Sequence, residues 1–212
     1  MKDWTEFKKA HYGQNTVFQS EWGAIDFSPD SLAGLAGGER LTYDEYLEIQ
    51  RQSAKNVRHY FERCYYSIAL NFRGQIERRT RDNICFKMIY VEGMYPDGTC
   101  FDGKEDHVWM ESKGFEACQE GDYFSFGAEV YRYLKTGSGK AVDFGLRNPN
   151  GITRITEYGL PSDKALVEQE IALIVCESCF LSEKCTGSYC ILRKYAKDRA
   201  MALRRFLDTL SE

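Results

Sequence analysis

The sequence predicts an α+β protein in three parts, and three observations carry this prediction. Apolar side chains recur every three or four residues after residue 42, they alternate between residues 84 and 158, and four of the eight cysteines fall within residues 176–190. A period near 3.6 is typical of helices and a period of two is typical of strands. We expect an N-terminal helical part over 1–82, a small antiparallel β-barrel over 83–160, and C-terminal helices over 161–212 joined by a four-cysteine metal site.

The first helix is predicted to begin at Thr42. Thr42 and Glu45 have the spacing of a capping box, in which each side chain accepts a hydrogen bond from the other residue's backbone N–H. The apolar and aromatic positions from Tyr46 to Ile68 then follow a helical spacing. We expect helical character to continue to about Arg81, with Gly74 as a point where the helix can break.

Residues 84–158 are predicted to form about five short strands. Ile84, Phe86, Met88 and Tyr90 alternate, and the sequence "PDG" at 96–98 supplies the turn of a hairpin. The stretch "EGDYFSFGAEVYRYLK" predicts a long strand in which Gly127 marks a bulge. Several strands without a long helix between them favour a curled antiparallel barrel.

Two helices are predicted for the C-terminal part. The stretch "PSDKALVEQEIALIV" begins the first, and "YCILRKYAKDRAMALRRFLDTL" forms an amphipathic, basic second helix. Arg193, Lys197 and Arg204 are spaced by four and seven residues, so we expect them to lie along one face. This face either keeps the protein soluble or contacts nucleic acid or an acidic protein partner.

The cysteines Cys176, Cys179, Cys185 and Cys190 predict a metal site. Their spacing, C-x2-C-x5-C-x4-C, brings four thiolates together within a short loop, as a tetrahedral zinc site requires. The spacing resembles a zinc knuckle, with cysteine in place of histidine as the third ligand and one extra residue before it. Zinc is the favoured metal because a fourth ligand is local, and the site is expected to be structural. Four buried thiols or a disulfide pair are the alternative without a metal.

The C-x2-C-x5-C run also resembles the cysteines of [4Fe–4S] proteins, namely MutY-type DNA glycosylases, WhiB-type regulators and RecB-type nucleases. In these families the fourth cysteine lies upstream, and this chain offers Cys64, Cys85, Cys100 and Cys118 there. A [4Fe–4S] cluster is therefore the alternative cofactor.

The nuclease resemblance extends to a nominal catalytic pattern that consists of Asp97, Glu111, Lys113, Gln119 and Tyr123. RecB-type nucleases place the glutamine and tyrosine on one helix. Here Gly121 and the apolar alternation predict a strand, so Gln119 and Tyr123 should not share a helical face. We expect no enzyme activity.

Charge is distributed unevenly along the chain. Residues 51–81 contain eight Lys/Arg and two Asp/Glu, whereas residues 92–129 contain two Lys/Arg and ten Asp/Glu. The predicted barrel is therefore acidic and its helical flanks are basic. The first residues, "MKDWTEFKKAHYGQ", lack an apolar segment, and no apolar run is long enough to span a membrane, so we expect a cytoplasmic protein.

The strand-rich block resembles OB-type accessory modules of phages and conjugative elements. Its strand-borne aromatics are Tyr90, Trp109, Phe124, Phe126, Tyr131 and Tyr133, but no basic loops accompany them. The resemblance implies an anti-CRISPR inhibitor or a DNA-handling accessory protein. We therefore predict a zinc-containing, non-enzymatic binding protein of a mobile element, which inhibits a nucleic-acid-processing host defence protein such as a CRISPR nuclease. Nucleic-acid binding through the basic helices is the alternative, and an iron–sulfur RecB-type nuclease is the second alternative.

Overall fold

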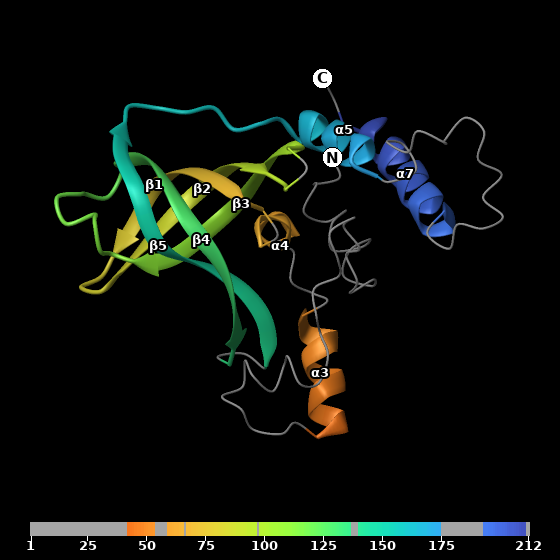
Figure 1. Cartoon of the computed structure of the whole chain (residues 1–212), viewed down its shortest axis with the longest axis horizontal. Helices are drawn as coiled ribbons and strands as arrows, with labels where there is room; N and C mark the ends of the chain where they lie inside the picture. Colours follow the sequence, from red (N-terminus) through yellow and green to blue (C-terminus); the bar gives the residue numbers. More distant parts are fainter. Residues whose placement is uncertain are drawn as a thin grey trace. The chain divides into compact units, whose positions relative to one another are not determined.

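The computed structural model describes residues 42–53, 59–65, 67–96, 98–136, 140–174 and 193–210. Within these ranges the chain divides into two compact units, one inside Lys8–Leu160 and the other inside Pro161–Glu212. The elements, in chain order, are the helices and strands α3 (Tyr43–Ser53), α4 (His59–Cys64), β1 (Ala69–Arg79), β2 (Asn83–Met94), β3 (Cys100–Glu111), β4 (Tyr123–Lys135), β5 (Ala141–Ile155), α5 (Asp163–Ala172) and α7 (Arg193–Leu207) (Figure 1). The predicted α+β class is confirmed.

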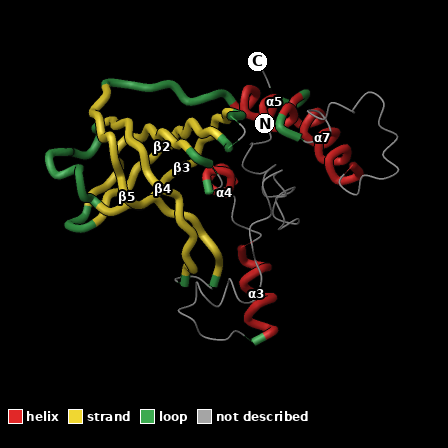
Figure 2. The backbone as a smooth tube through the Cα atoms, in the orientation of Figure 1, coloured by secondary structure: helices red, strands yellow, loops and turns green. Residues whose placement is uncertain are grey.

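The five strands form one antiparallel sheet in the order β3-β2-β1-β4-β5. Strands β1 and β2, β2 and β3, and β4 and β5 pair as neighbours in sequence, whereas β1 and β4 pair across a long stretch of chain. Figure 2 shows β4 and β5 continuing together beyond the other strands. No backbone ladder joins the described edge strands β3 and β5, although Cα atoms of the two come within 8 Å of each other. The sheet is therefore not the closed barrel that we predicted.

Helix α4 contacts both edge strands. The ring of Tyr60 lies directly on Gly103 of β3, where an added Cβ would be only 2.6 Å from the ring atom Cδ1. The backbone N–H of Tyr60 donates a hydrogen bond of 3.2 Å to Oε1 of Glu105, which is a buried carboxylate. Glycine is needed at position 103 because any side chain would collide with this ring.

Helix α3 begins where the capping box predicts. The Thr42 N–H donates to Oε2 of Glu45 at 3.0 Å, and the Glu45 N–H donates to Oγ1 of Thr42 at 3.3 Å. At its other end, the buried Ser53 hydroxyl donates to the Ile49 carbonyl at 2.6 Å and accepts from the Val142 N–H at 2.8 Å. The Ser53 hydroxyl thus links the end of α3 to β5.

The predicted continuation of this helix to Arg81 is wrong, because residues 69–79 form β1. Phe72, Gly74 and Ile76 are buried, and the positions between them are half-buried, as in a strand. Phe72 stacks on Phe126 of β4 at a centroid distance of 5.8 Å, and Phe86 of β2 lies 5.0 Å from the same ring. This aromatic cluster forms the centre of the core.

The hairpin with its turn at residues 96–98 is confirmed. Strand β2, however, contains a bulge that changes the side of the sheet on which its later side chains lie. Met88 has a φ of 51° and 39% of its surface is exposed, whereas Ile89 and Val91 are fully buried. Arg73 pairs with Tyr90 and Gln75 with Lys87, so Met88 is the extra residue of a bulge. The predicted alternation through Met88 and Tyr90 is therefore wrong, because the bulge turns Tyr90 away from the core.

The bulge predicted at Gly127 is confirmed by the register of β4 and β5. Ser125 pairs with Thr153, Gly127 with Asn150 and Glu129 with Arg147, so the additional residues lie on β5. A Cβ at Gly127 would lie 2.5 Å from Oδ1 of Asn150, which explains the glycine.

The second unit consists, in its described part, of α5 and α7. Ser162 caps α5 by accepting the Ala165 N–H at 3.1 Å. Arg199 of α7 forms an ion pair of 2.7 Å with Glu170 of α5, whose side chain is fully buried. None of the described helices has the length and apolar character needed to cross a membrane.

Candidate functional site

The candidate site is the face of the sheet that points away from the aromatic core, which we call the outer face. Its side chains in β1 to β4 alternate with the buried ones. The strand register places them in three rows, namely Arg78, Cys85 and Trp109; Tyr123, Gln75, Lys87 and His107; and Ser125, Arg73, Tyr90 and Lys104. Each row contains at least one aromatic ring and one cationic side chain.

The aromatic rings of the outer face remain partly open to solvent. Trp109 is 40% exposed, and Tyr90 and Tyr123 are half-buried. The other aromatics that the sequence suggested as ligand contacts divide between two places. Phe124 and Phe126 are buried in the core, whereas Tyr131 and Tyr133 lie on the distal half of β4, with their ring centroids 5.8 Å apart.

Hydrogen bonds fix the third row in position. The Arg73 guanidinium lies 2.8 Å from Oε2 of Glu92, and its Cζ lies 5.1 Å from the centre of the Tyr90 ring. The Tyr90 hydroxyl lies 2.8 Å from Oδ1 of Asp102 and 3.1 Å from Oε1 of Glu92. Burial, followed by these two carboxylates, raises the pKa of Tyr90, so the hydroxyl stays protonated and keeps its partners.

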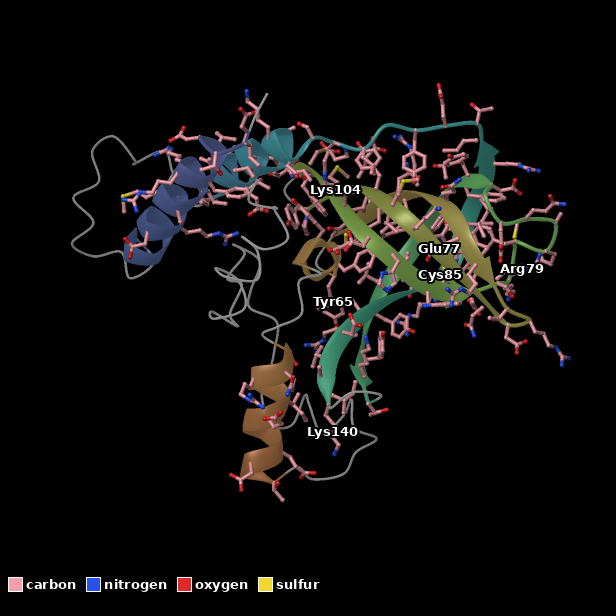
Figure 3. The ribbon with its side chains drawn as sticks, turned by 180° about the vertical axis from the view of Figure 1, so that it is seen from behind. Tyr65, Glu77, Arg79, Cys85, Lys104 and Lys140 are labelled. Carbon is pink, nitrogen blue, oxygen red and sulfur yellow. The ribbon has the colours of Figure 1, made fainter. Side chains whose placement is uncertain are left out.

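The turn between β1 and β2 is basic. Arg78 and Arg81 are exposed, and Arg79 donates to the backbone carbonyls of Glu116 and Cys118 at 3.0 and 3.1 Å. Figure 3 shows Arg79 near this end of the sheet. The expectation that the strand block lacks basic loops is therefore wrong, because these arginines belong to a hairpin of the sheet.

In Figure 3, Glu77 and Cys85 lie close together on neighbouring strands, and the Cys85 thiol is 3.6 Å from the Glu77 carboxylate. Cys85 is only 2% exposed, so its thiol is not presented to a ligand, and the first row offers only Arg78 and Trp109.

Many of the acidic side chains predicted to form an acidic face make hydrogen bonds or ion pairs within the unit that contains the sheet. Residues 69–155 contain 12 Lys/Arg and 13 Asp/Glu, which is nearly balanced. The acids with a partner in this unit include Glu92, Asp102, Glu105, Glu116, Asp122 and Glu129. Three of these acids, Glu92, Asp122 and Glu129, pair with arginines, so part of the acidity read along the sequence is compensated in space.

The predicted metal ligands Cys176, Cys179, Cys185 and Cys190 lie outside the described residues. Upstream, Cys64, Cys85 and Cys118 are buried and Cys100 is exposed, and each belongs to a different segment. Burial raises the pKa of the Cys118 thiol, which keeps it protonated at neutral pH. The described part of the chain holds no group of three or more His, Cys, Asp or Glu side chains suited to a metal ion. Zinc and [4Fe–4S] both stay predictions.

Four of the five nominal nuclease residues are described. Glu111 ends β3 and Lys113 lies in the turn that follows it, whereas Asp97 lies outside the described residues. Gln119 lies in a turn and Tyr123 begins β4, so the prediction that they share no helical face is confirmed.

The candidate contacts of the C-terminal helix are described in part. Arg193 and Lys197 fall within α7, but their side chains lie outside the described residues. Arg204 is exposed, and so are Met201 one turn before it and the adjacent Arg205, whereas Leu203 and Phe206 are buried. The helix is thus amphipathic, as predicted.

Sequence reasoning missed the outer face as a site. Arg73, Arg78 and Arg81 were assigned to a helix, and the bulge at Met88 hid the orientation of Tyr90. One available signal was the alternation of Leu70, Phe72, Gly74 and Ile76, followed by the polar turn "TRDN". Comparison of the chain with protein-family models, with curated proteins and with solved structures finds no match.

Proposed function

We propose that the protein binds single-stranded nucleic acid on the outer face of its sheet. The three rows of aromatic and cationic side chains carry this proposal. Proteins that bind single strands combine rings on which bases stack with basic groups that follow the phosphates. Trp109, Tyr90 and Tyr123 offer the rings, and Arg78 and Lys87 offer the charges.

The sheet topology supports an OB-like reading of this unit. Four of the strands follow the spatial order β4-β1-β2-β3, which is the order of a Greek key, and β5 is added beside β4. An OB fold is a five-stranded, partly open Greek-key barrel that binds oligonucleotides on its second and third strands and on the loops after strands one and four. The first and third rows cross β2 and β3, and the turn after β1 holds Arg81.

Single strands fit the outer face better than a duplex. Stacking on Trp109 or Tyr90 requires a base whose face is uncovered, and a duplex covers the faces of its bases. The rows extend across β1 to β4, which at about 4.8 Å between strands spans roughly 14 Å. A few nucleotides of an extended strand cover this distance, in keeping with the site sizes of about 4–16 nucleotides known for OB folds.

Fluorescence anisotropy with a labelled oligothymidylate tests the proposal. Trp109→Ala should weaken binding by about tenfold or more, since stacking contributes about 1–3 kcal/mol per base. The matched control is Tyr65→Ala, because Tyr65 is 41% exposed, close to the 40% of Trp109, but lies outside the rows. Equal affinity of the parent and the Trp109 variant would refute a stacking site on this face.

A second pair of variants tests the phosphate contact. Lys87→Gln should reduce the dependence of log Kd on log salt by about 0.7. Lys140→Gln removes the same charge outside the rows, where Lys140 forms an exposed ion pair with Glu45 at 3.3 Å, and should leave the slope unchanged. Duplex DNA of the same length should bind more weakly than the single strand.

The second candidate function is inhibition of a host defence nuclease by an acidic face of a phage or conjugative-element protein. This function has less support. Glu92, Asp122 and Glu129 each pair with an arginine, which reduces the negative charge that such a face could offer. A structural zinc at the four C-terminal cysteines stays part of the proposal, because four thiolates suit that metal.

A further inference from the structure

Tyr158 lies across the middle of the outer face. It belongs to residues 156–160, the segment that follows β5 and is drawn in teal in Figure 1. The other four residues of this segment are exposed, whereas Tyr158 is half-buried. The chain therefore touches the sheet here through one side chain.

The Tyr158 hydroxyl is held in the bulge of β2. It donates a hydrogen bond of 2.6 Å to the carbonyl oxygen of Met88. Met88 lies where the register between β1 and β2 shifts, so the tyrosine is anchored at the bulge itself.

The hydrogen bond between Tyr158 and Met88 lies between the second and the third row. Gln75 belongs to the second row, and the bulge separates Lys87 of that row from Tyr90 of the third. The Tyr158 ring also meets the ring of Tyr123 edge to face, at a centroid distance of 5.8 Å and an angle of 76°. A base that stacks on Tyr123 and a strand that crosses both rows must compete with Tyr158.

We propose that Tyr158 is a latch, by which the segment after β5 covers the nucleic-acid site until a ligand displaces it. This inference rests on the function proposed above. A ligand that binds only the unlatched form has its apparent affinity reduced by the fraction of molecules in that form. Because one side chain holds the segment, unlatched molecules should be a minority of about one in ten.

Anisotropy with the same oligothymidylate tests the latch. Tyr158→Ala should bind about tenfold more tightly than the parent, and Tyr158→Phe, which keeps the ring but loses the hydrogen bond to Met88, should fall between them. Leu160→Ala is the matched control, because Leu160 is 41% exposed in the same segment, and its affinity should equal that of the parent. Equal or weaker binding by Tyr158→Ala, with the parent binding measurably, would overturn the latch and leave the nucleic-acid site standing.

Hydrogen exchange of the unliganded protein separates the two proposals. The amides of Met88 and Ile89 at the bulge should exchange faster in Tyr158→Phe than in the parent, because the hydrogen bond that holds the Met88 carbonyl is gone. Unchanged exchange there would overturn the latch whatever the protein binds. Failure of the parent and of Tyr158→Ala alike to bind any oligonucleotide would overturn the proposed function, and the latch with it.

Discussion

Replacing Gly103 with alanine tests how α4 is fastened to the sheet. A Cβ at this position would lie 2.6 Å from Cδ1, 2.7 Å from Cγ and 2.9 Å from Cβ of Tyr60. The Tyr60 side chain is fully buried and its backbone is tied to Glu105, so the ring has no open space to enter. Overpacking of this kind costs about 1–3 kcal/mol. In a unit that spans Lys8–Leu160, each kcal/mol lowers Tm by about 2–4 °C.

Urea unfolding followed by circular dichroism measures this loss. Gly159→Ala is the control, because nothing lies within 4 Å of a Cβ at position 159, and its stability should stay within about 0.5 kcal/mol of the parent. Tyr60→Ala alone should cost about 3–5 kcal/mol, and Gly103→Ala should cost less in that background than in the parent. An unchanged unfolding midpoint for Gly103→Ala, or strict additivity with Tyr60→Ala, would refute the contact.

Three further predictions concern other parts of the chain. Cys179→Ser should lower thermal stability and the zinc content measured by mass spectrometry; retention of both would exclude a structural zinc site. Changing Arg193, Lys197 and Arg204 together to Glu should preserve the far-UV spectrum and weaken binding to acidic partners, whereas unchanged affinity would assign this face of α7 to solubility. Burial raises the pKa of Tyr158 to about 12 from 10.0, so its contribution to stability is complete below pH 10 and is lost between pH 10 and 12, a loss absent from Tyr158→Phe.

The purified protein should leave single- and double-stranded DNA intact with magnesium or manganese. Gln119 lies in a turn and Tyr123 begins β4, so these two residues do not share the helical face that the pattern requires. Cleavage that disappears in Glu111→Ala would contradict this expectation.

Features set by local chemistry were predictable from the sequence. The capping box of Thr42 and Glu45 and the turn at residues 96–98 depend on neighbours a few residues apart, and both are confirmed. Strand β1 was missed because Ile68, Phe72 and Ile76 are spaced by four residues, a spacing that fits one helix face and one strand face equally. Only the pairing of β1 with β2 and β4 separates the two readings, and pairing is not local.

The candidate site was less predictable than the fold. It depends on the register of four strands and on two bulges between β1 and β2, one at Met88 and one between Ile76 and Arg78. Without the bulge at Met88, the Tyr90 side chain would point into the core, and the Arg73 guanidinium would not lie over its ring. A periodicity of two cannot reveal such a residue, because the bulge breaks the periodicity itself.

Photochemical cross-linking of single-stranded DNA to the whole protein, followed by mass spectrometry of the peptides, tests the central claim most directly. The account predicts nucleotide adducts on the β2–β3 hairpin, at Tyr90 or Trp109, and on Tyr123 at the start of β4. Added salt should reduce the yield of these adducts, because it weakens the contacts between the basic side chains and the phosphates. Adducts confined to the C-terminal helix over 193–210, with none on the sheet, would contradict the assignment of the outer face as the binding site.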